Sequence, residues 1–506
     1  MPNDRATDYD HGVFNAYAVL AGFLSLVQLG VGTVALLVGA RLLYASGSRS
    51  QSLGRLASPD KSPPPESLTR REDRLYLAVV LGTVQLIVTV VGWPLLYLLL
   101  QSYVPRWPGV MCIYGVLRIG SESDGAAGWL PTLLSTLQCT KPIGVLLAGA
   151  WFELYRLDRS TSHSPLARRV VGLLVLTSAL TVVDSAVELS YLAIPKQDES
   201  LSVGCCTAPA DSARWSQRLP TTIWTDDSHR LLLVAAAVVA NGLFVGGLMA
   251  VARACRRASL FPMTLAALGV GVVASLPANL LLLTHWLAPS LLHLPYHACP
   301  YDLVSRAPES LVGLAAVSFG YLAASWAAML LLVGRVDGGG ALRFVAAGRL
   351  SERALLGLLI GATLLGAELA LNDLRPPTGC HYDGQPIDAR HQVRVEIEGE
   401  VARGLIGGSA RGNRDGLTTR RFCSLACVEA WLAASKAEVK TIWVTDERTG
   451  AELPAHDGYY VRSRVISHPW TRDRRHVFAR ESDARAHAES FQGRLLEGEQ
   501  RPRFAR

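Results

Sequence analysis

Residues 75–101 read LYLAVVLGTVQLIVTVVGWPLLYLLLQ, a run of 27 residues that holds no charged side chain. A helix needs about 20 such residues to cross the hydrocarbon core of a bilayer. Comparable apolar runs occupy approximately residues 14–43, 129–155, 170–194, 230–252, 262–287, 310–334 and 353–372. The sequence therefore predicts a polytopic α-helical membrane protein with about eight transmembrane helices, followed by a polar C-terminal region.

The composition agrees with this prediction. Half of the 506 residues are apolar and only 18% are charged, which is too apolar for a soluble chain of this length. The formal net charge is +7, but the basic residues lie in short connections between the apolar runs and form no single patch. We therefore expect the lipid bilayer as a partner and expect no binding to nucleic acid.

The basic residues predict the orientation in the membrane. They concentrate in alternate connections, at residues 41–74, 156–169, 253–257 and 335–353, and are sparse in the others. Under the positive-inside rule the basic connections face the cytoplasm, so both ends of the chain lie outside. We expect a multi-pass protein of the cell (inner) membrane. Residues 1–374 would form the transmembrane domain and residues 375–506 a domain on the periplasmic, extracytoplasmic side.

The hydrophobic pattern changes after Pro377. Residues 392–398 and 441–445, and the region around 459–461, alternate with the period of two that is typical of strands. Residues 422–435 and 482–491 read as helices. The order strand, helix, strand, strand, helix predicts a small α+β domain.

The candidate metal ligands of this domain centre on Cys423 and Cys427. Their spacing of four places both sulfurs on one helix face, and Cys423 stands at the helix start, where the dipole favours a thiolate. Cys380 is the natural third donor, with His381 and His391 close by in sequence. Three soft donors favour Cu(I), whereas His381 as a fourth ligand would suit zinc. A disulfide remains an alternative, although two thiols at this helical spacing are poorly placed for one.

Further soft donors lie in the predicted outer loops. Outside the cytoplasm, exposed thiols form disulfides or hold metals, so the cysteines are either disulfide-bonded or weaker metal ligands, and the histidine is a weaker metal ligand. They are Cys112, Cys205, Cys206, His297 and Cys299.

Charged residues of the third and fourth predicted spans are candidates for a contact inside the membrane. Lys141 lies near the middle of the third span, where a lone ammonium is costly. Asp184 and Glu188 lie in the fourth span at a spacing that places both on one helix face. A structural ion pair between Lys141 and Asp184 is the simpler interpretation, and a proton or ion pathway is the alternative.

The C-terminal region resembles a known family. The resemblance covers residues 380 to about 496 and is carried by the motifs Ile442-Trp443-Val444-Thr445-Asp446, Thr449-Gly450, Gly458-Tyr459-Tyr460-Val461, His476-Val477-Phe478-Ala479 and Asp483-Ala484. These motifs resemble the periplasmic nitrous-oxide-reductase accessory proteins (NosL-like family). The stretch from Phe422 to Cys427 is similar to the C-terminal half of a TRASH or YHS metal-binding finger.

The resemblance implies a metallochaperone that delivers copper to an extracytoplasmic cuproenzyme such as nitrous oxide reductase. The chain departs from the family at two points. Cys380 supplies one thiol where the family has paired cysteines with a methionine, and His468 precedes Pro469 where the family has a methionine after a proline. His468 is therefore a further, weaker candidate ligand.

Two other functions stay open at this stage. The outer-loop cysteines would serve a membrane thiol-disulfide oxidoreductase, although the chain contains no Cys-x-x-Cys motif. A transporter would place Lys141 and Asp184 on its path. We recognise no catalytic residue set, so the sequence favours a binding protein over an enzyme.

The predicted orientation is testable with reporter fusions at the C-terminus. An exported phosphatase fused there should be active, and a fluorescent protein that folds only in the cytoplasm should stay dark, because the basic connections hold the opposite side inside. Fluorescence without phosphatase activity would show that the orientation is reversed.

Overall fold

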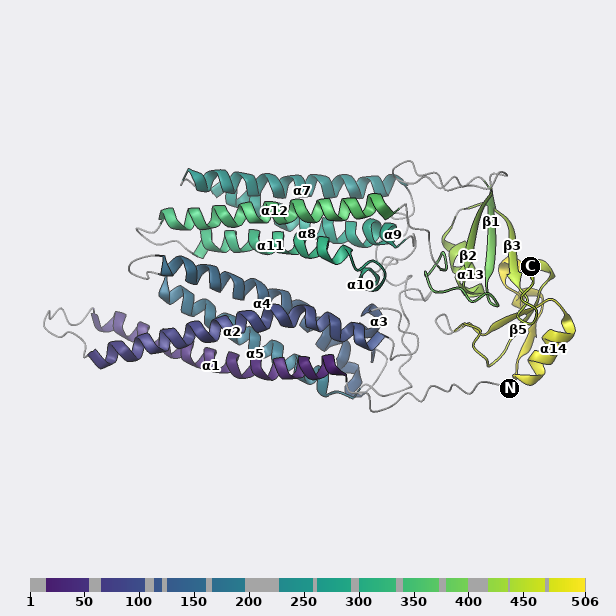
Figure 1. Cartoon of the computed structure of the whole chain (residues 1–506), viewed down its shortest axis with the longest axis horizontal. Helices are drawn as coiled ribbons and strands as arrows, with labels where there is room; N and C mark the ends of the chain where they lie inside the picture. Colours follow the sequence, from purple (N-terminus) through teal and green to yellow (C-terminus); the bar gives the residue numbers. More distant parts are fainter. Residues whose placement is uncertain are drawn as a thin grey trace.

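The structure, a computed structural model, describes residues 15–53, 65–104, 113–120, 125–160, 166–195, 227–257, 262–292, 300–333, 340–372, 379–398, 417–435, 437–468 and 473–505. Long helices run side by side through the first three quarters of the chain. The strands gather in a separate domain at one end of the helices (Figure 1).

The first four long helices pack into one bundle. Within it α1 contacts α2 and α5, and α4 contacts the same two helices. Their bounds are α1 Ala16–Leu53, α2 Pro65–Tyr103, α4 Leu130–Arg159 and α5 Ala167–Ala193. We call these four helices bundle A.

The second set of long helices forms bundle B, in which α12 packs against α7 and α11, and α7 against α8. The bounds are α7 Asp227–Arg256, α8 Pro262–Leu282, α11 Ser310–Val333 and α12 Gly340–Asn372. A π-helical turn, Leu283–Leu287, continues α8 into α9, Ala288–Leu291. The described residues of the helical part also include three short helices, α3 Ile113–Leu117, η2 Ala126–Trp129 and α10 Asp302–Arg306.

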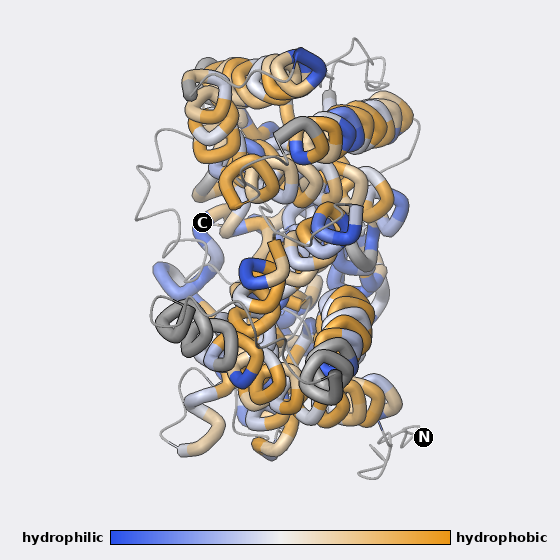
Figure 2. The backbone as a smooth tube through the Cα atoms, turned by 90° about the vertical axis from the view of Figure 1, so that its left-hand side faces the viewer, coloured by the Kyte–Doolittle hydropathy of each residue, from blue (hydrophilic) through white to orange (hydrophobic). Residues whose placement is uncertain are grey.

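The surfaces of the long helices are apolar. Eight helices are long and apolar enough to span a membrane, counted over the described residues. Large side chains such as Phe23, Val273 and Leu359 are 61%, 73% and 65% exposed, and hydrophobic positions continue around the helices (Figure 2). An apolar exterior of this kind suits lipid as the surrounding solvent. The predicted class, eight apolar helices followed by a small sheet domain, is confirmed.

The eighth helix begins earlier than the sequence indicated. It starts at Gly340, whereas the apolar run begins near residue 353. The helix extends because Phe344, Ala347 and Leu350 repeat at helical spacing and pack into the hydrophobic core shared by both bundles. Arg343 therefore lies on a helix, with its guanidinium 4.8 Å from the centre of the Phe344 ring, and belongs to no loop.

The C-terminal domain contains two antiparallel sheets. The first has the order β2-β1-β3-β4 and the second β6-β5-β7. The strands are β1 Val393–Glu398, β2 Leu417–Phe422, β3 Val439–Thr445, β4 Glu452–Pro454, β5 Tyr459–Arg462, β6 Arg475–Phe478 and β7 Arg494–Leu496. Its described residues also form two helices, α13 Leu425–Ala434 and α14 Glu481–Ser490, and one-turn 3-10 helices at Ala455–Asp457, Gly498–Gln500 and Arg503–Ala505.

The three strands and two helices predicted for this domain are confirmed, and no end differs by more than three residues. Four strands were missed. Of these, β4 and β7 are only three residues long, and β2 reads LTTRRF, which lacks a regular apolar alternation. Val393, Phe422, Trp431 and Val444 form the buried centre of the domain, against which the candidate ligands pack.

Candidate metal centre

Two of the candidate ligands flank the start of α13. Cys423 follows the last residue of β2, and Ser424 is the N-cap of α13, with its hydroxyl accepting a hydrogen bond from the Cys427 amide at 3.3 Å. Cys423 therefore precedes the helix, and the expectation that both cysteines lie on one helix face is wrong. The two thiols instead meet because one follows the end of a strand and the other lies in the first turn of the helix, with the sulfurs 3.6 Å apart.

The third thiol comes from a tight turn at Cys380 to Gln385. The Cys380 amide donates to the Gln385 carbonyl at 2.8 Å, and the Gly384 amide donates to the Cys380 carbonyl at 2.7 Å. Gly379 enters this turn with φ +97°, and a side chain there would meet the Gly384 carbonyl oxygen at 2.6 Å. Only glycine fits such a position, so the turn geometry that presents Cys380 depends on Gly379.

The turn also delivers a carboxylate. Asp383 Oδ1 accepts a hydrogen bond from the Gln385 amide at 3.0 Å, and its Oδ2 lies 3.5 Å from Cys423 Sγ and 3.3 Å from Cys427 Sγ. Cys380, Asp383, Cys423 and Cys427 offer one ligand atom each, all within 4.8 Å of one another, and each residue is at most 2% exposed. We call these four residues the Cys3Asp group.

The donor set of the Cys3Asp group fits a soft or borderline metal ion. A metal held about 2.3 Å from each sulfur in tetrahedral geometry separates the sulfurs by about 3.8 Å. The 3.6 Å between Cys423 and Cys427 is close to this value. The four atoms therefore need only small shifts to bind zinc through three sulfurs and one oxygen, or Cu(I) through the three sulfurs.

The protonation states follow from the crowding of four acidic groups. Burial opposes ionisation of Cys380, but hydrogen bonds from the Cys423 and Cys427 thiols outweigh it and hold the pKa of Cys380 well below its ordinary value. The same hydrogen bonds to Cys380, together with burial, raise the pKa of Cys423 and of Cys427. Burial and the charge on Cys380 raise the pKa of Asp383 to about 7. The group thus concentrates its negative charge on Cys380 and keeps protons on the other two thiols.

The histidines predicted from sequence lie around the Cys3Asp group, not in it. His381 packs edge-on against Phe422 and Trp431, and burial together with the charge of Arg420 lowers its pKa to about 4, so it is neutral. His391 makes an ion pair with Glu447, with 3.2 Å between Nδ1 and Oε1. His468 is buried, and this burial lowers its pKa. The charge of Cys380 acts in the opposite direction, which shows that the two residues lie near each other.

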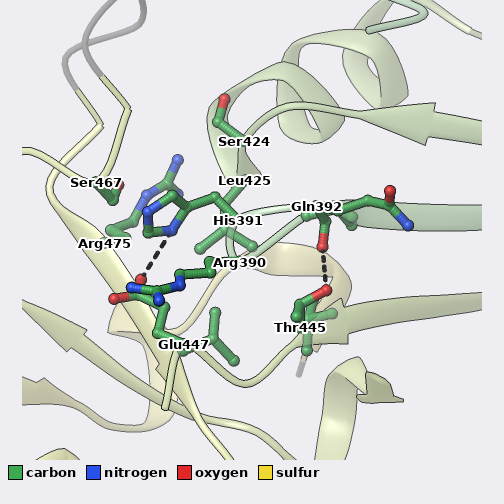
Figure 3. A pocket seen from close by; sticks show the side chains of 12 residues that line it. Arg390, His391, Gln392, Ser424, Leu425, Thr445, Glu447, Ser467 and Arg475 are labelled. Carbon is green, nitrogen blue, oxygen red and sulfur yellow. Dashed lines mark hydrogen bonds and ion pairs between the residues drawn. The ribbon is translucent and has the colours of Figure 1, made fainter. Parts of the chain in front are cut away.

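A polar pocket lies beside the start of α13. Ser424 and Leu425 form one wall, and Arg390, His391 and Glu447 lie across from them (Figure 3). Its empty volume is about 270 Å³, counting the part open to solvent. Glu447 also pairs with His476 at 2.8 Å, and the two histidines lower the pKa of Glu447 against the effect of its burial. This charged network joins the two sheets next to the Cys3Asp group.

One contact ties the metal-site turn to the helical part. Arg306, the last residue of α10, donates from Nη1 to the Gly384 carbonyl at 2.8 Å and from Nη2 to the Asp383 carbonyl at 3.3 Å. The turn that carries Cys380 and Asp383 therefore rests on the end of bundle B that faces the C-terminal domain (Figure 1). Any displacement of α10 acts on this turn through two hydrogen bonds.

The remaining predicted ligands cannot be placed. Cys112, Cys205, Cys206, His297 and Cys299 lie outside the described residues. Their roles as disulfides, redox pairs or metal ligands stay predictions.

Sequence reasoning missed Asp383, and a signal for it was present. The segment Cys380-His381-Tyr382-Asp383-Gly384 places a carboxylate three residues after a thiol and directly before a glycine. A tight turn over such a segment brings the carboxylate close to the thiol. The arginine contact had no such signal, because Arg306 and Gly384 are 78 residues apart.

Fold and site together define a protein with eight membrane-length apolar helices and a C-terminal domain that buries three thiols around a carboxylate. Comparison with protein families, with curated proteins and with solved structures finds no match to the chain. The resemblance to the NosL-like and TRASH families therefore stays an expectation from the quoted motifs.

The pKa shifts predict how metal affinity depends on pH. Cys423 and Cys427 have raised pKa values and carry protons at neutral pH, so a metal that binds both thiolates must expel about two protons. Affinity should rise by about 100-fold per pH unit between about pH 6 and about 7, which competitive titration at several pH values measures. A pH-independent affinity would show that these two thiols are not ligands.

Proposed function

We propose that this protein is a membrane-anchored copper-trafficking protein that holds Cu(I) at Cys380, Cys423 and Cys427. The observation that carries the proposal is the convergence of three buried thiols from two separate segments of the C-terminal domain. Thiolates are the protein ligands that bind Cu(I) most strongly, and three of them match its trigonal preference. Burial protects such thiols from oxidation and the bound ion from water.

In this proposal Asp383 supports the sulfurs and does not bind the metal. Its carboxyl lies 3.3 Å from Cys427 Sγ and 3.5 Å from Cys423 Sγ, which is hydrogen-bonding range for a sulfur atom. A protonated carboxyl there donates to a bound thiolate and spreads its charge, as outer groups do at other metal sites. Cu(I) then retains three sulfur ligands.

Structural zinc is the competing function, and one observation favours it. Asp383 supplies a fourth, oxygen donor, and zinc sites that stabilise folds are four-coordinate. Under that alternative the metal would stabilise the domain and would not be cargo. The two proposals differ in the role of the Asp383 oxygen, which makes this residue the discriminating position.

The resemblance of the quoted motifs adds a destination for the metal. It supports delivery of copper to an extracytoplasmic cuproenzyme such as nitrous oxide reductase. Part of the motif has a visible structural role: Asp446 accepts hydrogen bonds from Thr449 and from the Ala479 amide, which joins the β3–β4 turn to the end of β6. The helical part anchors the domain, and the contact from Arg306 keeps the metal-site turn at the membrane end.

The test is competitive titration of the reduced full-length protein with Cu(I) and, separately, with Zn²⁺. Serine replaces Cys112, Cys205, Cys206 and Cys299 in every sample, so that these thiols do not contribute. Cys423→Ser and Cys427→Ser should each lower Cu(I) affinity by at least about 100-fold, because each removes one of three ligands. Asp383→Asn, which still donates a hydrogen bond but is a poor ligand, should change Cu(I) affinity by less than about 10-fold.

Cys139→Ser is the matched control, since Cys139 is an exposed thiol on α4 and should not affect binding. If the serine variants at 423 and 427 bind Cu(I) as tightly as the parent, the Cys3Asp group is not the copper site. If Cu(I) does not displace bound Zn²⁺ and Asp383→Asn abolishes Zn²⁺ binding, the structural-zinc function replaces the proposal.

A further inference from the structure

A second buried charged cluster lies in the interior of bundle A. Lys141 on α4 contacts two carboxylates of α5, with Nζ 2.8 Å from Asp184 Oδ2 and 2.5 Å from Glu188 Oε2. All three residues are at most 4% exposed. The ion pair expected between Lys141 and Asp184 is thus part of a triad that contains one cation and two anions.

The charges of this triad do not balance. If all three side chains are ionised, the cluster holds a net charge of −1 in a site that is closed to water. Among the described residues, the other buried polar side chains on these helices near the triad are uncharged: Ser25 and Gln28 on α1, Gln85 and Thr89 on α2, and Ser178, Thr181 and Ser185 on α5. Thr140 on α4, which is partly buried, is also uncharged. An uncompensated buried charge costs several kcal/mol, so one further positive charge is needed.

The hydrogen bonds identify where that charge resides. Asp184 accepts from Thr140 Oγ1 through Oδ1 and from Lys141 through Oδ2, so both oxygens act as acceptors, as an ionised carboxylate requires. Glu188 accepts from Ser25 and Lys141 through Oε2 alone. Because both of these hydrogen bonds use Oε2, Oε1 is the oxygen on which a proton would sit.

A proton fits this position better than a metal cation. The ammonium of Lys141 already occupies the space between the two carboxylates, and the hydroxyls of Ser25 and Thr140 donate to one oxygen of each. A Na⁺ or larger cation would need about five or six free oxygen ligands. We propose that Lys141, Asp184 and Glu188 form a proton-binding site in which Glu188 carries one exchangeable proton.

Hydrophobic layers close this site on both sides. Toward the C-terminal domain lie Leu96, Leu134, Leu137 and Tyr191, and in the opposite direction lie Trp151, Leu154 and Leu174. Of the residues named in these layers, only Tyr191, on α5, is titratable. The proton is therefore occluded, and its exchange with water requires one layer to open.

Unpaired polar atoms extend the site along the bundle. Gln85 Nε2 and Ser185 Oγ are buried and have no hydrogen-bond partner among the described residues. Ser185 lies on α5 between Asp184 and Glu188. Gln85, on α2, accepts a hydrogen bond from Ser178, which lies on α5 two turns before Ser185. Buried polar atoms of this kind are the usual partners of internal water, which carries protons through a closed interior.

Infrared spectroscopy of the full-length protein in lipid nanodiscs tests this proposal. At neutral pH the spectrum of the parent minus that of Glu188→Gln should contain the C=O band of a protonated carboxylic acid. The band should shift slowly in D2O, and it should shift again when the glutamate side-chain carboxyls carry ¹³C. Asp184→Asn should also lose the band, since the remaining Lys141 and Glu188 then balance.

Two further variants complete the experiment. Lys141→Met should add a second band, because the cation that keeps Asp184 ionised is gone. Glu352→Gln, on the exposed side of α12, is the control and should leave the spectrum unchanged. The absence of a band in the parent-minus-Glu188→Gln spectrum would overturn the proposal. Loss of the band on addition of Na⁺ or K⁺ at fixed pH would also overturn it, because a cation would then occupy the site.

Discussion

A charge removed from water must be balanced nearby, and this constraint acts at both centres of the molecule. In the C-terminal domain three thiols and a carboxyl share a space in which all ligand atoms lie within 4.8 Å of one another. Hydrogen bonds to Cys380, together with burial, keep protons on Cys423 and Cys427 until a cation replaces them. In bundle A the same constraint acts on Lys141, Asp184 and Glu188, where one cation faces two anions.

The two centres differ in what can satisfy that constraint. Sulfur donors at 3.6 Å separation suit a soft metal ion, whereas carboxylate oxygens already bound by ammonium and hydroxyl donors suit a proton. Arg306 provides a physical link between the helical part and the metal centre, since its guanidinium holds the carbonyls of the turn that carries Cys380 and Asp383. Movement in bundle B would therefore change the geometry of one metal-ligand segment.

The parts predicted from sequence were those with local signals. Twenty-residue apolar runs and period-two strands are local patterns, so the class of fold and the three thiols could be proposed in advance. Asp383 was missed because its approach to Cys423 depends on a turn formed around Gly379 with φ +97°. Ser25 and Glu188 were not paired because they are 163 residues apart, and a one-dimensional pattern contains no information on which helices become neighbours.

The central claim is that three sulfurs of the Cys3Asp group bind Cu(I) while Asp383 stays outside the coordination shell. X-ray absorption at the copper edge measures this directly on the Cu(I)-loaded full-length protein with serine at the four outer-loop cysteines. We predict a single shell of three sulfur atoms at about 2.3 Å, with no oxygen or nitrogen neighbour at bonding distance. A shell dominated by imidazole nitrogen, or one that survives Cys423→Ser unchanged, would contradict the account.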